Sequence, residues 1–173
     1  MALVRVLDMS VFALVAVAVL LPRPNVKVQV GLDLAPSQRV ELAELQAQLL
    51  QSPGALEPSF ALSSLLLDGG RPEWALAVLA PALAQHPADY RLHMRRSLAL
   101  AEHFEGNTAY AAAERALALC ENGSSHPCAE PDRVRLGLLA STLARVKDID
   151  IRDNPNTAKI RILEALRPGH FYR

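Results

Sequence analysis

The sequence predicts an all-α protein in which a single transmembrane helix and a short extended linker precede a domain of antiparallel helix pairs. Two observations support this class. Apolar residues make up 51% of the chain but aromatic residues only 5%, so alanine and leucine, which favour helices, dominate. From residue 37 onward, apolar side chains recur at helical spacing. We therefore divide the chain into an anchor (1–24), a linker (25–36) and a helical domain (37–173).

The charge and the motif content argue against nucleic-acid binding and catalysis. The chain has 18 basic and 18 acidic residues, without the basic excess that a nucleic-acid surface requires. None of its five histidines forms an H-E-x-x-H motif, and no phosphate-binding loop, dinucleotide-binding glycine pattern or G-x-S-x-G motif occurs. We therefore expect no enzyme activity, metal, cofactor or small-molecule substrate, and no nucleic acid as a partner.

Residues 2–21 are expected to anchor the chain in a membrane. They contain only two charges, Arg5 and Asp8, and Pro22 and Pro24 would end their helix. About 20 apolar residues cross a bilayer. We interpret the segment as an uncleaved signal anchor with the helical domain on the extracytoplasmic, periplasmic side. A cleaved signal peptide and a buried helix are the alternatives, and the flanking charges leave the orientation open.

The linker carries a different pattern. Residues 26–34 alternate apolar and polar side chains with period two, which is typical of a strand. Such a segment either adds a strand to a partner's sheet or extends between membrane and domain. We favour the extended linker.

The helical domain is expected to begin at Ser37, a suitable N-cap. Ser52-Pro53-Gly54 ends the first helix. The next stretch divides at Asp68-Gly69-Gly70 into two short helices, the second with Pro72 in its first turn.

A pattern in this domain recurs at a constant offset along the sequence. The glycine-marked turn is followed by Ala75, Leu79, Ala82 and Pro87. Both alanines recur further along the chain at the same separation, as Ala109 and Ala116. The pattern resembles the tetratricopeptide repeat, which has a period of about 34 residues and in which small residues let paired helices approach closely.

The resemblance covers 58–120 well and 131–168 more loosely, because inserted loops around 121–131 and 147–156 break the register. It implies stacked antiparallel helix pairs. The helix at 37–51 would then cover one end of the stack.

The resemblance also implies a partner-binding surface, because in this family the first helix of each pair lines the concave face. With Arg95, which clusters beside Arg91, the residues expected there are Phe60, Ser64, Leu67, Asp68, Arg91, Met94, Arg95, Leu98 and Glu102. Their mixed aromatic, thioether and basic character suits an extended peptide or a partner helix. For Leu67 and Leu98, burial in the core is the alternative.

Two further features of the helical domain are interpreted from local spacing. Cys120 and Cys128 flank a turn-rich segment, which a disulfide can close outside the cytoplasm; two free thiols are the alternative. Glu114-Arg115 and 132–135 are expected to be solvated helix faces with local ion pairs.

Together, these expectations indicate a membrane-anchored adaptor that binds other membrane or periplasmic subunits and assembles or stabilises an envelope complex. The alternative is an integral accessory subunit of a large membrane enzyme complex. Asp8 would favour that alternative, because an acid within an anchor can pair with a basic residue on another transmembrane helix.

Overall fold

The computed structural model describes residues 35–148, 155–157 and 160–161. All of them belong to one compact unit, Leu32–Arg173. The expected anchor at 2–21 and the strand-like pattern at 26–34 lie outside the described residues. Every regular element of the described part is a helix, which confirms the all-α class. Within that part, no helix combines the length and the apolar character that a membrane span needs.

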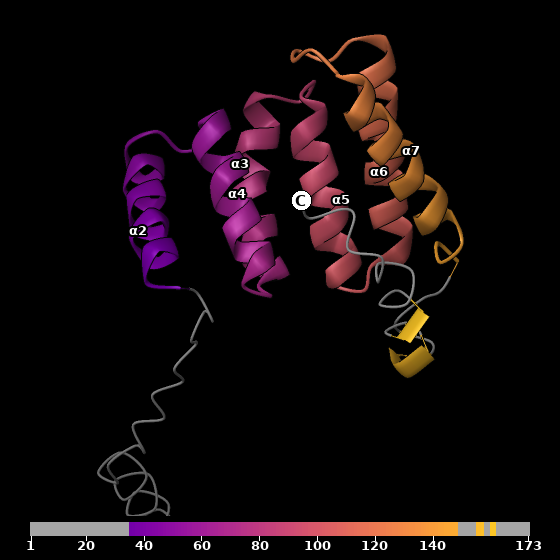
Figure 1. Ribbon diagram of the computed structural model, residues 1–173, viewed down its shortest axis with the longest axis horizontal. Coiled ribbons are helices and arrows are strands. Elements are labelled where there is room, and N and C mark those ends of the chain that lie inside the picture. The colour runs from indigo at the N-terminus through magenta and orange to yellow at the C-terminus, as the bar shows by residue number, and fades with distance from the viewer. Residues whose placement is uncertain (1–34, 149–154, 158–159, 162–173) are drawn as a thin grey trace, which may run out of the picture. The chain divides into compact units, whose positions relative to one another are not determined.

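The helices between residues 35 and 148 are α2 (Pro36–Gln51), α3 (Leu56–Asp68), α4 (Pro72–Gln85), α5 (Tyr90–Glu102), α6 (Gly106–Asn122) and α7 (Glu130–Ala144). Each packs against the next along the chain, and α3 also contacts α5. Figure 1 shows the helices side by side in chain order, running alternately up and down. Neighbours in sequence are therefore antiparallel neighbours in space.

The first of these helices has its N-cap two residues earlier than expected. Ala35, and not Ser37, is the N-cap of α2, and the backbone N–H of Ala35 donates to the Oε1 atom of Gln38 at 2.9 Å. Pro36 occupies the first helical position, where a fixed φ is favourable and a backbone N–H is not needed. Pro36 therefore sets the start of the helix, and the expectation of Ser37 as the N-cap was wrong.

The helix starts follow the offset found in the sequence. The separation between Leu56 of α3 and Tyr90 of α5 equals that between Pro72 of α4 and Gly106 of α6, and both equal the offset of the alanines. The turns that end α3 and α5 also correspond. Gly70 has φ 65° in the first turn, and Phe104 has φ 63° at the same place in the second.

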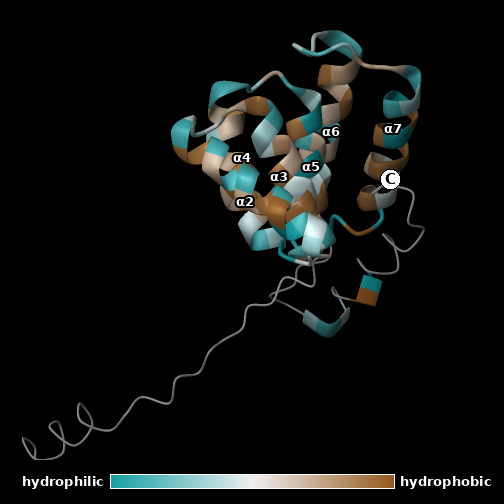
Figure 2. Ribbon diagram, turned by 60° about the vertical axis from the view of Figure 1, so that its left-hand side comes forward, coloured by the Kyte–Doolittle hydropathy of each residue, from teal (hydrophilic) through white to brown (hydrophobic). Residues whose placement is uncertain are grey.

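The core consists mainly of leucine and alanine. The four alanines of the sequence pattern are fully buried: Ala75, Ala82, Ala109 and Ala116. Small side chains there let adjacent helices pack closely. Ser97, also fully buried, donates its hydroxyl proton to the carbonyl of Ala109 at 2.8 Å and so links α5 to α6. In Figure 2, hydrophobic and hydrophilic stretches occur on every helix.

Candidate functional site

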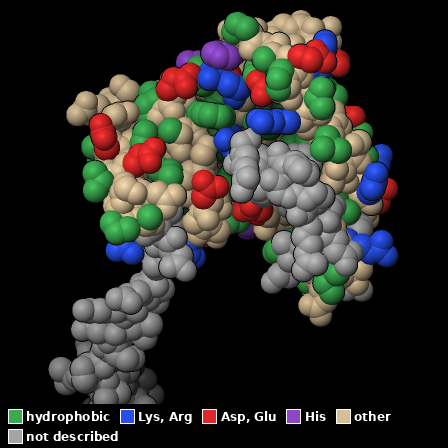
Figure 3. All heavy atoms as spheres, viewed as in Figure 1, with side chains coloured by type: hydrophobic (Ala, Val, Ile, Leu, Met, Phe, Trp, Pro, Cys, Tyr) green, Lys and Arg blue, Asp and Glu red, His purple; other side chains and the backbone are tan. Residues whose placement is uncertain are grey.

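A groove of about 180 Å³ lies between α3, α5 and α7. It is lined by nine residues: Phe60, Tyr90, Arg91, Met94, Arg95, Leu98, Asp132, Arg135 and Leu139. Five of the residues expected on the concave face are among them: Phe60, Arg91, Met94, Arg95 and Leu98. Figure 3 shows basic and acidic side chains close together on the part of this surface that is drawn in colour.

Phe60 organises the basic side of this groove. The guanidinium carbon of Arg95 lies 4.8 Å from the centre of the Phe60 ring, and that of Arg91 lies 5.5 Å from it. Both arginines come from α5 and reach across to α3. A cation above an aromatic face is attracted by the ring quadrupole, so Phe60 holds both charges at the groove.

Arg91 is held from its other side by acids. Its Nη2 atom lies 3.0 Å from Oδ2 of the fully buried Asp89 and 2.9 Å from Oε1 of Glu57. Burial opposes the ionisation of Asp89, but the hydrogen bonds and the positive charge of Arg91 outweigh it and lower the pKa of the carboxyl group. Asp89 also caps α5, because its side chain accepts the backbone N–H of Arg91 at 2.9 Å. The carboxylate therefore fixes the start of α5 and the position of Arg91 together.

Tyr90 joins α5 to α7 at the edge of the groove. Its hydroxyl donates to Oδ2 of Asp132 at 2.7 Å. Burial of the phenol and this bond raise the pKa of Tyr90 to about 12. The interpretation of 132–135 as a purely solvated face was therefore wrong for Asp132, which binds a buried tyrosine. It holds for Arg133, whose ion pair with Glu130 is local.

The α7 side of the groove was missed by sequence reasoning. Asp132, Arg135 and Leu139 all line it. Their spacing of three and four residues puts them on one helix face, which is a signal that the sequence contains. The other expected pair of charges, Glu114-Arg115, is exposed, and Glu114 accepts the hydroxyl of Tyr110 at 2.6 Å.

Four of the expected concave residues do not line the groove. Leu67 is 3% exposed and belongs to the core, which agrees with the alternative stated for it. Ser64 donates its hydroxyl proton to the carbonyl of Phe60 at 2.9 Å. Asp68 and Glu102 are the last residues of α3 and α5, beyond the parts of these helices that line the groove.

Leu98 combines the two roles that the sequence left open. It is fully buried, as a core residue is, and it also contributes to the groove floor. The alternatives of core and concave face are therefore not exclusive at this position.

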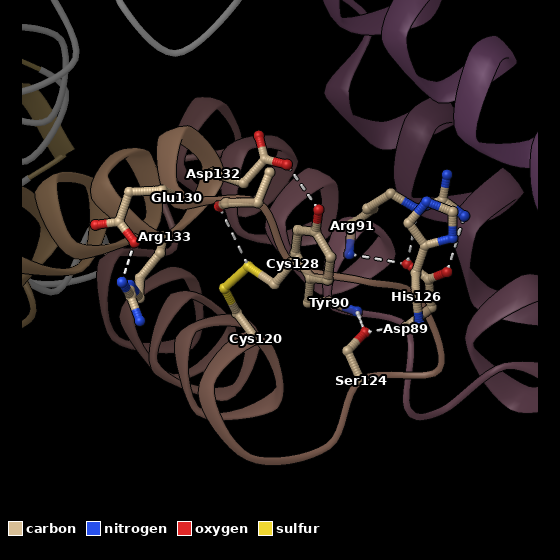
Figure 4. The surroundings of a disulfide bond; sticks show 11 residues. Asp89, Tyr90, Arg91, Cys120, Ser124, His126, Cys128, Glu130, Asp132 and Arg133 are labelled. Carbon is tan, nitrogen blue, oxygen red and sulfur yellow. Dashed lines mark hydrogen bonds and ion pairs between the residues drawn. A yellow bond between two sulfur atoms is a disulfide. The ribbon is translucent and has the colours of Figure 1, made fainter.

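A disulfide loop lies next to this site. Cys120, near the end of α6, is bonded to Cys128, which precedes α7, with a Cα–Cα distance of 5.2 Å. Within the loop, the N–H of Ser125 donates to the carbonyl of Ala88 at 3.1 Å, and Ser124 accepts the N–H of Tyr90 at 3.4 Å. Figure 4 shows the disulfide beside Tyr90. The loop therefore connects the start of α5 with the start of α7.

Side chains that could bind a metal are not clustered. In the part of the chain that the structure describes, no group of three or more histidine, cysteine, aspartate or glutamate residues is arranged to hold an ion. The chemistry available at the groove is that of guanidinium groups, one carboxylate, a phenol and apolar surface. Such groups bind and orient a ligand by charge, hydrogen bonds and apolar contact.

No protein-family model, curated protein or solved structure matches this chain.

Proposed function

We propose that the protein is a membrane-anchored adaptor that holds a segment of a partner protein in the groove and thereby assembles or stabilises an envelope membrane complex. The observation that carries this proposal is the gathering of Phe60, Arg91, Met94, Arg95 and Leu98 around one groove. Charged, aromatic and apolar groups together in a concave site are typical of surfaces that bind polypeptides.

A tetratricopeptide-type arrangement is part of this proposal. It is supported by the constant offset between helix starts, by the corresponding turns and by the contact between α3 and α5. The helix α2 fits the same scheme as the second helix of a preceding pair, because its last residue, Gln51, precedes Gln85 at the end of α4 by the same offset. Helix pairs stacked in this way offer an extended binding surface.

Crosslinking in native membranes tests the adaptor function. A photo-crosslinking amino acid replaces Met94 in the groove or, as a control, Ala111, which is exposed on α6. We expect one partner to be captured from position 94, to co-purify in stoichiometric amount, and to be lost when Arg95→Glu is added. Equal capture from both positions, or no partner that responds to Arg95→Glu, would overturn the proposal.

The anchor is tested separately. In the full chain, replacement of Ala16 and Val17 by arginine puts two charges into the apolar segment, at a cost of about 2.5–3.5 kcal/mol each at a helix centre. We expect the unchanged protein to stay with membranes after alkaline extraction and the variant to be released. Retention of the variant would argue against an anchor at 2–21.

The second candidate function is that of an accessory structural subunit in a large membrane enzyme complex. The observation in its favour is the exposed apolar surface on α2 and α7, where Val40 is 70%, Leu50 85% and Val134 61% exposed. In a permanent complex such side chains are covered by neighbouring subunits. A complex that survives extraction and high dilution supports the subunit, whereas one that dissociates supports the adaptor.

A further inference from the structure

We propose that a second groove, between α4 and α5, binds one fatty acid, with its alkyl chain between the helices and its carboxylate at Arg96. This inference goes beyond the adaptor function, because the α4–α5 groove shares no lining residue with the groove between α3, α5 and α7. It follows from the size and the apolar lining of the α4–α5 groove and from the positive charge beside it.

The α4–α5 groove is large and almost entirely apolar. Its volume is about 380 Å³, within the range of small-molecule sites. Leu79 and Leu100 of its lining are buried in the core, whereas Ala80 is exposed. The groove therefore has a floor that is fixed by packing and a side that is open to solvent. Six residues line it: Leu76, Leu79, Ala80, Leu83, Arg96 and Leu100.

This lining favours an alkyl chain over a polypeptide. A peptide segment has N–H and C=O groups that need hydrogen-bond partners wherever they lose contact with water. The leucine and alanine side chains of the groove cannot supply such partners, and Arg96 supplies donors only. An alkyl chain needs no polar partner, and its burial is favourable in proportion to the apolar area that leaves water.

The charge of Arg96 is not neutralised within the described part of the chain. There, neither Arg96 nor Arg115 of α6 forms a hydrogen bond or an ion pair, and both are exposed. Burial lowers the pKa of His93, against the effect of its hydrogen bond to the carbonyl of Pro87. The charges of Arg115 and Arg96 lower this pKa further, and Asp89 opposes them with a smaller effect. The surroundings of His93 and Arg96 are therefore positive, and an anionic group is favoured there.

The position of Arg96 in the groove suits a carboxylate with one attached chain. A guanidinium can donate two parallel hydrogen bonds to a carboxylate. Arg96 and Leu100 lie one helical turn apart on the same face of α5. A carboxylate bound to Arg96 therefore places its alkyl chain beside the apolar lining. One charged group with one apolar groove matches a fatty acid, whereas a phospholipid has two chains.

A photoreactive fatty acid tests this site. Hexadecanoic acid with a diazirine in mid-chain is irradiated with the full-length protein in phosphatidylcholine vesicles, and mass spectrometry locates the residues to which it attaches. We expect attachment to the lining residues of α4 and α5. Unlabelled hexadecanoic acid should suppress this attachment at a concentration at least about tenfold lower than hexadecanol, which has the same chain without the charge.

Matched variants separate the charge from the apolar lining. Arg96→Gln removes the charge at the groove, whereas Arg133→Gln removes one that pairs locally with Glu130. We expect Arg96→Gln to abolish the advantage of the acid over the alcohol and Arg133→Gln to preserve it. Ala80→Phe fills the groove and should prevent attachment, whereas Ala77→Phe adds the same ring on α4 outside the lining and should not. All four positions are exposed, so these changes leave the fold intact.

Several results would contradict the inference. Attachment confined to residues 2–21 or spread evenly over the helices is one, and equal suppression by the acid and the alcohol is another. If phosphatidylglycerol with a diazirine in one chain attaches to the groove and the fatty acid does not, the ligand is a phospholipid and the inference is wrong. It is also wrong if a photo-crosslinking amino acid at position 80 captures a polypeptide, because the groove is then a protein interface.

Discussion

At the scale of single residues, Tyr90 links three parts of the domain. Its ring packs in a small cluster with Ala116, Leu119 and Leu136, and its side chain is only 2% exposed. Its hydroxyl reaches Asp132 on α7, and its backbone N–H reaches the disulfide loop. One side chain therefore couples the start of α5 to both of the elements that follow α6.

The first prediction concerns this hydroxyl. Tyr90→Phe keeps the packed ring but leaves Asp132 without the donor, so we expect a loss of about 1–2 kcal/mol in the free energy of unfolding. Tyr110→Phe is the matched control, because that hydroxyl binds Glu114 on the exposed surface of one helix. Surface pairs of this kind contribute little. Urea denaturation of both variants measures the difference. Equal free energies of unfolding would show that the hydrogen bond to Asp132 does not contribute to stability.

The raised pKa of Tyr90 leads to a second prediction. Because the pKa is about 12 in the folded protein and about 10 when unfolded, the unfolded state loses its proton first as the pH rises. The contribution of this group is therefore complete below pH 10 and is lost between pH 10 and 12. We expect the stability difference between wild type and Tyr90→Phe to shrink over that window. A constant difference up to pH 12 would contradict the assigned partner.

At the scale of elements, the disulfide loop determines how α7 packs against the preceding helices. A third helix at the offset that relates α3 to α5 would begin at Ser124, but α7 begins at Glu130. Most of the residues between belong to the loop that Cys120 and Cys128 close. The loop displaces the start of α7 along the sequence and still brings Asp132 to Tyr90.

This displacement explains what could and could not be read from the sequence. Five of the six groove residues on α3 and α5 were predicted, because residues such as Phe60 and Arg91 belong to helices that keep the offset; Tyr90 was missed. Asp132 and Arg135 could not be predicted in this way. The inserted loop changes the spacing before α7, so positions on α5 no longer correspond to positions on α7 at the constant offset. The contact of Tyr90 with Asp132 joins residues 42 positions apart, and no local pattern contains it.

The third prediction concerns the disulfide. Closing a loop of this length restricts the unfolded chain, and the chain-entropy model assigns it about 2–3 kcal/mol. We expect reduction, or the double variant Cys120→Ser with Cys128→Ser, to lower the free energy of unfolding by that amount. Hydrogen exchange is expected to accelerate first at the start of α7. The control is the double variant with reductant, which must show no further change.

At the scale of the whole described domain, α2 is attached by a small number of contacts. None of its residues is buried, although Leu42, Leu45 and Leu49 pack partly against the core. Its far end is held by a turn in which Gln85 of α4 donates to the carbonyl of Pro53 at 2.7 Å. The turn after α2 is therefore also a contact with α4.

Gly54 in this turn makes the last prediction possible. It has φ 84°, and a Cβ atom there would lie 2.9 Å from the carbonyl oxygen of Pro81 and 2.6 Å from Nε2 of Gln85. Gly70 has a similar φ of 65°, but a Cβ atom there meets nothing within 4 Å. Gly70→Ala should therefore cost only the left-handed strain, about 1–2 kcal/mol, whereas Gly54→Ala adds a clash with backbone. We expect Gly54→Ala to be more destabilising by about 1 kcal/mol or more and to accelerate hydrogen exchange in α2. If the two alanine variants unfold at the same denaturant concentration, the turn does not bear on α4, and α2 is held by its contacts with α3 alone.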